Sequence, residues 1–145
     1  MIPADDDPCS CGSGRPLGGC CGPLLAGAAA PTAERLMRSR YTAFAQRRID
    51  HLLRTWDAGT RPASLPLDPD RTWRGLRIVD TWAGGVDDEA GVVEFRAAYR
   101  DANGVGVLAE RSRFVRRGGD WRYVGPEEIS PSMRRAAAPP RRSRR

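Results

Sequence analysis

The first long periodic pattern of apolar residues in the chain has a helical spacing. Ala33, Met37, Tyr41 and Phe44 recur every three or four positions, which places them on one face of a helix. Thr32 directly precedes this run, and its hydroxyl is of the type that caps a first turn. The pattern therefore predicts an amphipathic helix that begins after Thr32 and packs its apolar face on a core.

A second, shorter helix is predicted to follow. Asp50 is expected to be its N-cap, and Leu52, Leu53 and Trp56 are expected to face the core. Residues 58–72 contain three prolines, which favours a loop.

After this loop the period of the apolar residues changes to two, which is typical of strands. Asn103-Gly104 and Gly118-Gly119 are hairpin turn signals between the later segments. The predicted strands cover residues 73–82, 90–101, 105–117 and 120–125. Helices followed by an antiparallel meander indicate an α+β fold, with the helices packed on one face of a curved four-stranded sheet.

The N-terminal region has no such periodicity but contains every cysteine of the chain. Cys9, Cys11, Cys20 and Cys21 form the pattern Cys-x-Cys-x8-Cys-Cys. The acidic N-terminus lacks the features of a secretory signal, so we expect a cytoplasmic protein with reduced thiols. Four clustered sulfurs then favour one closed, tetrahedral Zn²⁺ site.

Two other uses of the thiols stay open at this stage. A pair of low-pKa thiols can work as a redox switch, although two cysteines suffice for that. A structural disulfide is less favoured, because Cys20–Cys21 would be a strained vicinal pair and short loops gain little stability. Arg15 is expected to offset the negative charge of a four-thiolate site.

Two quoted segments resemble a known family. "CSCGSGRPLGGCCGPLLAG" is similar to the SEC-C motif, and "TAERLMRSRYTAFAQRRIDHLLRTW" is similar to the YchJ-type family of uncharacterised bacterial proteins. The resemblance spans residues 9–125. It implies a zinc motif followed by a nuclear-transport-factor-2-like cone, and it implies no established activity.

The chain is accordingly expected to comprise four parts. These are an acidic lead-in (1–8), a SEC-C-like zinc knuckle with its linker (9–30), the α+β cone (31–126) and a disordered Arg-rich tail (127–145). All 24 basic residues are arginine, which is consistent with a coding bias. Six of them lie in "MRRAAAPPRRSRR" and equal the formal net charge of +6. This tail is either a solvated terminus or an electrostatic arm for nucleic acid or the ribosome.

A second group of candidate residues belongs to the cone. Arg40 falls on the apolar face of the first helix, where it needs either a carboxylate such as Glu110 or an anionic ligand. The only histidine, His51, is expected at an exposed helix start, and no catalytic residue is assigned. Further residues that can line a pocket or a buried polar site in the cone are Ser112, Tyr99, Trp56 and Trp121.

The sequence thus predicts a zinc-binding interaction protein. Its four-cysteine knuckle would dock on a protein or ribonucleoprotein partner and would be supported by the cone. The alternative is a small-molecule binder or an enzyme that uses the pocket of the cone.

Overall fold

The computed structural model describes residues 4–127. The predicted Arg-rich tail (127–145) lies outside the described residues except for residue 127, so neither interpretation of it is tested. Within residues 4–127, no helix is both long enough and apolar enough to cross a membrane.

Helix α2 (Ala33–Gln46) forms where the apolar periodicity predicts it. The Thr32 hydroxyl accepts a hydrogen bond from the backbone N–H of Arg35 at 3.1 Å, which confirms the predicted N-cap. The helix ends at Arg47, whose φ of 59° is left-handed. The backbone N–H of Arg48 then bonds to Ala43 O at 2.7 Å and reverses the chain.

This tight reversal changes the start of helix α3 (Ile49–Arg54). The N-cap position is Arg48, which makes no capping bond through its side chain, and Asp50 lies in the first turn. The prediction of Asp50 as N-cap is therefore wrong by two positions. Its carboxylate instead pairs with Arg48 at 3.2 Å.

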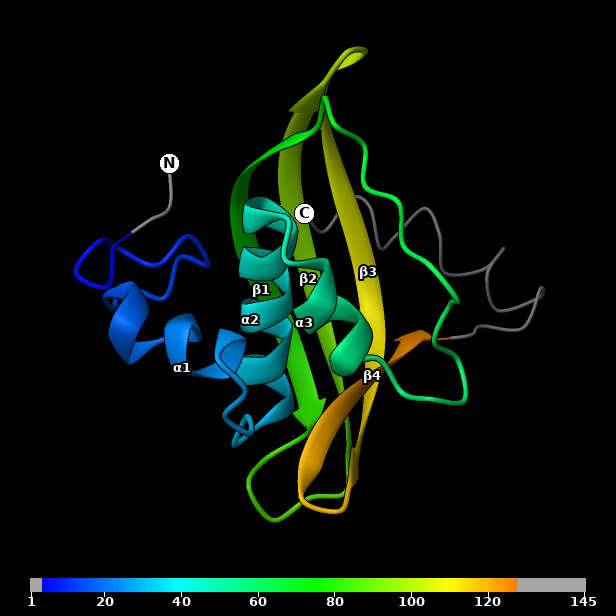
Figure 1. Ribbon diagram of the computed structural model, residues 1–145. Coiled ribbons are helices and arrows are strands. Elements are labelled where there is room, and N and C mark those ends of the chain that lie inside the picture. Colours follow the sequence, from blue (N-terminus) through cyan, green and yellow to red (C-terminus); the bar gives the residue numbers. More distant parts are fainter. Residues whose placement is uncertain (1–3, 128–145) are drawn as a thin grey trace.

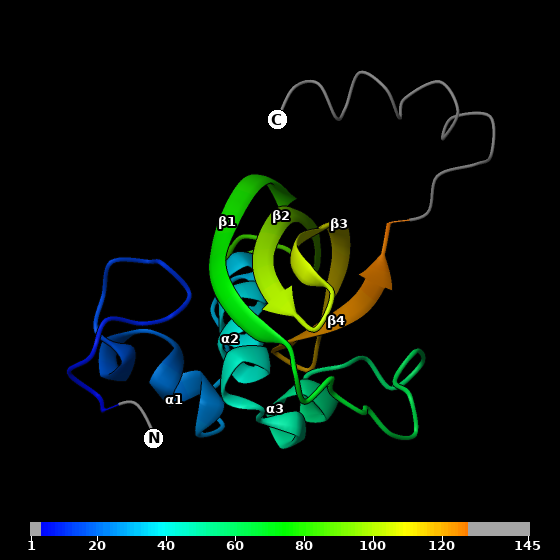
Figure 2. The ribbon, with the colours of Figure 1, turned by 90° about the horizontal axis from the view of Figure 1, so that it is seen from above.

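Four antiparallel strands follow in sequence order and form a single curved sheet (Figures 1 and 2). Helix α2 lies along the concave face of this sheet and α3 packs beside α2, which confirms the α+β prediction. The strands are β1 (Thr72–Ala83), β2 (Ala90–Asp101), β3 (Gly104–Arg117) and β4 (Asp120–Pro126).

The N-terminal segment packs against α2, and its end reaches α3 (Figure 2). It contains a short 3-10 helix, η1 (Leu17–Gly19), and helix α1 (Cys21–Leu25). All four cysteines are buried in the same apolar cluster as residues of α2 and the sheet, such as Phe114 and Trp121. The segment is thus part of the main core.

Candidate metal centre

The four cysteine sulfurs converge on one point beneath the N-terminal segment. All four Sγ atoms lie within 4.8 Å of one another. The Sγ atoms of Cys11 and Cys20 are 3.6 Å apart, and those of Cys20 and Cys21 are 3.9 Å apart. Tetrahedral zinc with Zn–S bonds of about 2.3 Å needs S–S separations of about 3.8 Å. The cluster therefore has the ligand number and spacing to hold a metal ion, and all four cysteines are free of disulfides.

The electrostatics of the cluster favour a cation. Hydrogen bonds from Cys11 and Cys21 lower the pKa of the Cys9 thiol well below its usual value. Hydrogen bonds with Cys11 and Cys9, together with burial, raise the pKa of the Cys21 thiol. The thiols alone therefore favour one thiolate and oppose a second, because two buried negative charges repel. A divalent cation removes this opposition and allows all four to ionise.

Helix α2 anchors the cysteine loop through two arginines and a threonine. Arg38 Nη1 donates to the carbonyl of Cys11 at 2.9 Å and lies 4.0 Å from the Cys11 sulfur. Arg35 Nη2 donates to the carbonyl of Cys20 at 3.4 Å. The fully buried Thr42 hydroxyl lies 3.7 Å from the Cys9 sulfur.

The positive charge beside the thiols thus comes from Arg38 and not from Arg15, which is exposed. Sequence reasoning missed this because Arg38 is 27 residues away from Cys11 along the chain. Only the packing of the N-terminal segment on α2 brings the two together.

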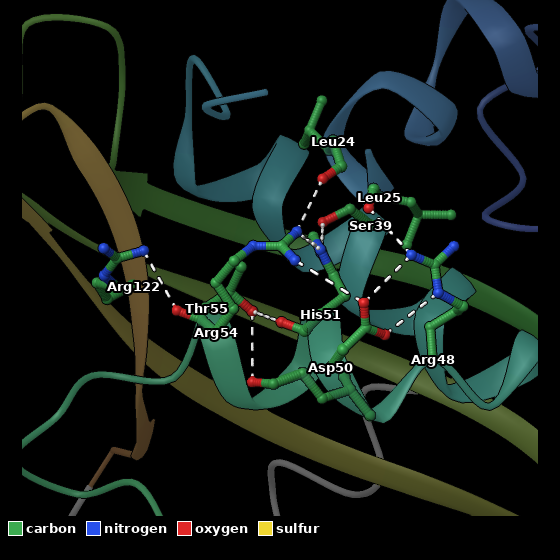
Figure 3. A network of polar contacts seen from close by, with 10 residues as sticks. Leu24, Leu25, Ser39, Arg48, Asp50, His51, Arg54, Thr55 and Arg122 are labelled. Carbon is green, nitrogen blue, oxygen red and sulfur yellow. Dashed lines mark hydrogen bonds and ion pairs between the residues drawn. The ribbon is translucent and has the colours of Figure 1, made fainter. Parts of the chain in front are cut away.

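Helix α3 holds the other end of the same segment (Figure 3). Arg48 Nη2 donates to Leu25 O at 3.2 Å, and Arg54 Nη2 donates to Leu24 O at 3.3 Å. The bond from Arg48 serves a carbonyl at the end of α1, where carbonyls have no partner within the helix, and Leu24 O also accepts from the backbone N–H of Gly27 at 3.0 Å. Two helices of the cone therefore fix both ends of the cysteine segment.

His51 is a buried structural residue, contrary to the prediction that it is exposed. It is 1 % exposed, with Nε2 lying 2.9 Å from Ser39 Oγ and Nδ1 lying 2.8 Å from Arg54 Nη2. Arginine only donates, so Nδ1 is the acceptor and Nε2 carries the proton. Ser39 in turn donates to Leu36 O at 2.8 Å. The side chain is buried because α3 turns this face toward α2 (Figure 3).

Burial lowers the pKa of His51 to about 4, and the nearby charges of Arg54, Arg40 and Arg48 add to this effect. The imidazole is therefore neutral at physiological pH, and both ring nitrogens are engaged in hydrogen bonds. His51 and Ser39 are no more than 1 % exposed.

The predicted pocket residues separate into two groups. Arg40, Glu110, Ser112 and Trp56 line one cavity of about 90 Å³ on the concave side of the sheet. The other two candidates lie elsewhere. The Tyr99 ring lies 5.5 Å from that of Trp73, and Trp121 lines a separate hollow beside His51.

Arg40 and Glu110 line the same cavity without forming the expected ion pair. Among residues 4–127, no ion pair involves Arg40. Tyr123 lies between them: the Arg40 guanidinium is 4.4 Å from the centre of its ring, and its hydroxyl donates to Glu110 Oε2 at 2.7 Å. Sequence reasoning missed Tyr123, although its alternation with Trp121 on β4 indicates an inward position.

Comparison with known proteins identifies relatives of this chain and a family model for its α+β domain. Residues 32–126 match the family described as the middle NTF2-like domain of YchJ. A UPF0225 protein of Streptomyces coelicolor is 52 % identical over 121 residues, which cover 83 % of this chain and 94 % of that protein. A UPF0225 protein of Xanthomonas campestris is 47 % identical over 121 residues, covering 81 % and 92 %.

Two solved structures are also similar. The solution structure of a SEC-C motif containing protein from Rhodopseudomonas palustris has a TM-score of 0.72 and 32 % identity, covering 84 % of this chain and 98 % of that one. A crystal structure of a SEC-C motif containing protein from Psychrobacter arcticus, at 23 % identity, has a TM-score of 0.62 over 90 % of this chain and 85 % of its own, and it supports the fold alone. The chain therefore belongs to the YchJ-type UPF0225 family, in which a SEC-C motif precedes an NTF2-like domain.

Proposed function

We propose that this protein is a cytoplasmic zinc-binding interaction protein. Cys9, Cys11, Cys20 and Cys21 bind one Zn²⁺, which holds the N-terminal segment in the conformation that packs on α2. The observation that carries the proposal is the convergence of four buried sulfurs within 4.8 Å of one another. Four sulfur ligands fill a tetrahedral site and leave no open position for water or substrate. This is typical of a structural zinc site rather than a catalytic one.

Metal content tests the first half of the proposal. Protein purified without chelator is expected to contain one zinc per chain by elemental analysis. Cys20→Ser with Cys21→Ser is expected to contain none, because two thiolates are too few for a closed site. Arg15→Ala, at an exposed position of the same loop, serves as the control that retains the metal. Metal-free wild-type protein with four freely titrating thiols would contradict the proposal.

The second half of the proposal is that the metal-fixed segment presents a docking surface to a protein or ribonucleoprotein. Its support is the orientation of the segment: the sulfurs face α2, whereas the loop positions Gly12, Gly14, Arg15 and Pro16 are exposed. A rigid loop loses less conformational entropy on binding than a mobile one.

Quantitative affinity capture tests this surface. A specific partner is expected to bind the zinc-loaded wild-type protein and to be lost with Arg15→Glu, which reverses the charge of the loop. Glu89→Gln, whose side chain is 78 % exposed and lies outside the N-terminal segment, is the matched control that retains the partner. Equal capture by all three proteins would place the docking surface elsewhere.

A further inference from the structure

The cavity on the concave side of the sheet contains a buried cation with unused hydrogen-bonding capacity. Arg40 is 3 % exposed, and its two hydrogen bonds both leave from Nη1, to Leu52 O and Thr55 Oγ1 at 2.8 Å. A guanidinium has five N–H donors. The donors on Nε and Nη2 reach no hydrogen-bond acceptor in the part of the chain that the structure describes. The indole N–H of Trp56, another lining residue, is a buried donor without a partner among the described residues. An acceptor inside the cavity that reaches either residue would be stabilising.

The charge of Arg40 is balanced only by aromatic rings and by a carboxylate at a distance. The guanidinium lies 5.0 Å from the ring centre of Trp56 and 4.4 Å from that of Tyr123. Burial lowers the pKa of Arg40 to about 10, while the negative charge of Glu110 opposes this change. Arg40 therefore stays protonated at neutral pH and can donate to a ligand.

Glu110 offers the complementary group across the same ring. Its Oε2 accepts from Ser112 Oγ at 2.6 Å and from the Tyr123 hydroxyl at 2.7 Å. Its Oε1 accepts from none of the residues between 4 and 127. Arg40 on α2 is thus a donor, and Glu110 on β3 an acceptor, that can each make a further hydrogen bond, and both line the same cavity.

The remaining walls set the size and shape of an occupant. They are apolar, and the cavity of about 90 Å³ has room for one small ring. Leu108 is 40 % exposed and marks the mouth. The apolar side chains of the walls are those of Met37, Phe44, Trp56, Phe95 and Leu108.

We propose that this cavity binds a small, flat, uncharged molecule of the cyclic-amide type. Its carbonyl oxygen accepts from Arg40, its N–H donates to Glu110 Oε1, and its ring lies between the apolar walls. An anion would meet the carboxylate of Glu110, a cation would meet Arg40, and a hydrocarbon would leave the spare donors of Arg40 unpaired. The site is separate from the cysteine cluster and does not depend on the proposed docking role.

A titration with 2-pyridone, followed by ¹⁵N NMR on the full-length zinc-loaded protein, tests the proposal. Saturable shifts are expected for the indole N–H of Trp56 and the backbone amides of Phe95 and Ser112, with a Kd on the order of 1 mM for so small a ligand. The indole N–H of Trp121, which lines a different hollow, should not shift. Toluene and benzoate are expected to bind at least about 10-fold more weakly, which corresponds to about 1.4 kcal/mol. Absence of saturable shifts, or equal binding of the three compounds, would overturn the proposal.

Two variants locate the binding in this cavity. Glu110→Gln keeps the shape of the side chain but replaces one of the two acceptor oxygens with an NH2 donor. Ser112 and Tyr123 donate to the remaining oxygen, so the affinity for 2-pyridone is expected to fall about 5-fold or more. Leu108→Trp, at the partly exposed mouth, is expected to block entry without replacing a buried group. Glu89→Gln should bind like the wild type. Unchanged affinity in both Glu110→Gln and Leu108→Trp would show that 2-pyridone binds elsewhere.

Discussion

Helix α2 is packed on two sides, and the two sides are held by different chemistry. Toward the sheet, it contacts an apolar surface built from alternating strand residues such as Val93, Phe95 and Phe114. Toward the N-terminal segment, it contacts a glycine-rich loop in which Leu17 is the only large apolar residue between Cys9 and Cys21. The sheet side is stabilised by burial of apolar area, whereas the loop side depends on sulfur and on hydrogen bonds to backbone carbonyls.

Arginine side chains hold the N-terminal segment against the helices through its backbone. Arg35, Arg38, Arg48 and Arg54 each donate to a backbone carbonyl of the N-terminal segment. Arg54 uses the same Nη2 for Leu24 O and for the ring of His51, and a planar guanidinium is suited to such shared contacts. A high arginine content that is consistent with coding bias therefore includes side chains with a definite structural role.

The largest effect is expected from removal of two thiols, which tests whether the N-terminal segment unfolds together with the helices and the sheet. Cys20→Ser with Cys21→Ser is expected to lower the Tm by more than about 10 °C, because zinc and buried sulfur are lost from the main core. The tryptophan signal in near-ultraviolet circular dichroism should melt together with the rest of the protein. Arg15→Ala is the control. An unchanged Tm of the tryptophan signal would show that the segment is a separable module.

Low pH is expected to lower the free energy of unfolding through His51, which contacts Ser39 of α2 and Arg54 of α3. Its pKa is 6.5 in an unstructured chain and about 4 in the folded protein, so the folded state binds fewer protons between these values. Stability therefore falls as the pH decreases from 6.5 toward 4, by about 3 kcal/mol in total. Because the chain has a single histidine, the NMR titration of its ring protons reports this pKa directly. A midpoint near 6.5 in the folded protein would contradict the buried, neutral state.

Loss of one arginine contact should have a smaller effect. Arg38→Met keeps the apolar stem but removes the bonds to Cys11 O and to the Glu34 carboxylate. The side chain of Arg38 is 18 % exposed, and we expect a loss of about 2 kcal/mol in urea unfolding, together with faster zinc release to a chelator. Arg77→Met, at an exposed position of β1, should change neither quantity. Equal zinc-release rates in the two variants would remove Arg38 from the support of the metal site.

The smallest expected effect concerns the start of the helix that both sides share. Thr32→Ala removes the side-chain acceptor for the N–H of Arg35 and is expected to cost about 1 kcal/mol. Thr32→Ser keeps this acceptor and should retain most of the stability in the same urea titration. If the two variants are equally destabilised, the effect arises from the lost methyl group and not from the cap.

The local features of this protein follow from its sequence. The helical period from Ala33 to Phe44 places α2, the cap at Thr32 sets its start, and the glycine-containing turns at 103–104 and 118–119 separate the strands of the meander. These properties depend on neighbouring residues and on short-range geometry, so a pattern in the chain is enough to predict them. The spacing of the cysteines likewise predicts that their sulfurs meet.

Only the tertiary structure decided which partners the buried polar groups have. The sequence placed Arg40 on an apolar face but could not show that Tyr123 stands between it and Glu110. It also could not show that His51 turns inward to Ser39. A period specifies the face of an element, whereas the partner on that face depends on how distant elements pack, and hydrogen bonds need positions accurate to a few tenths of an ångström.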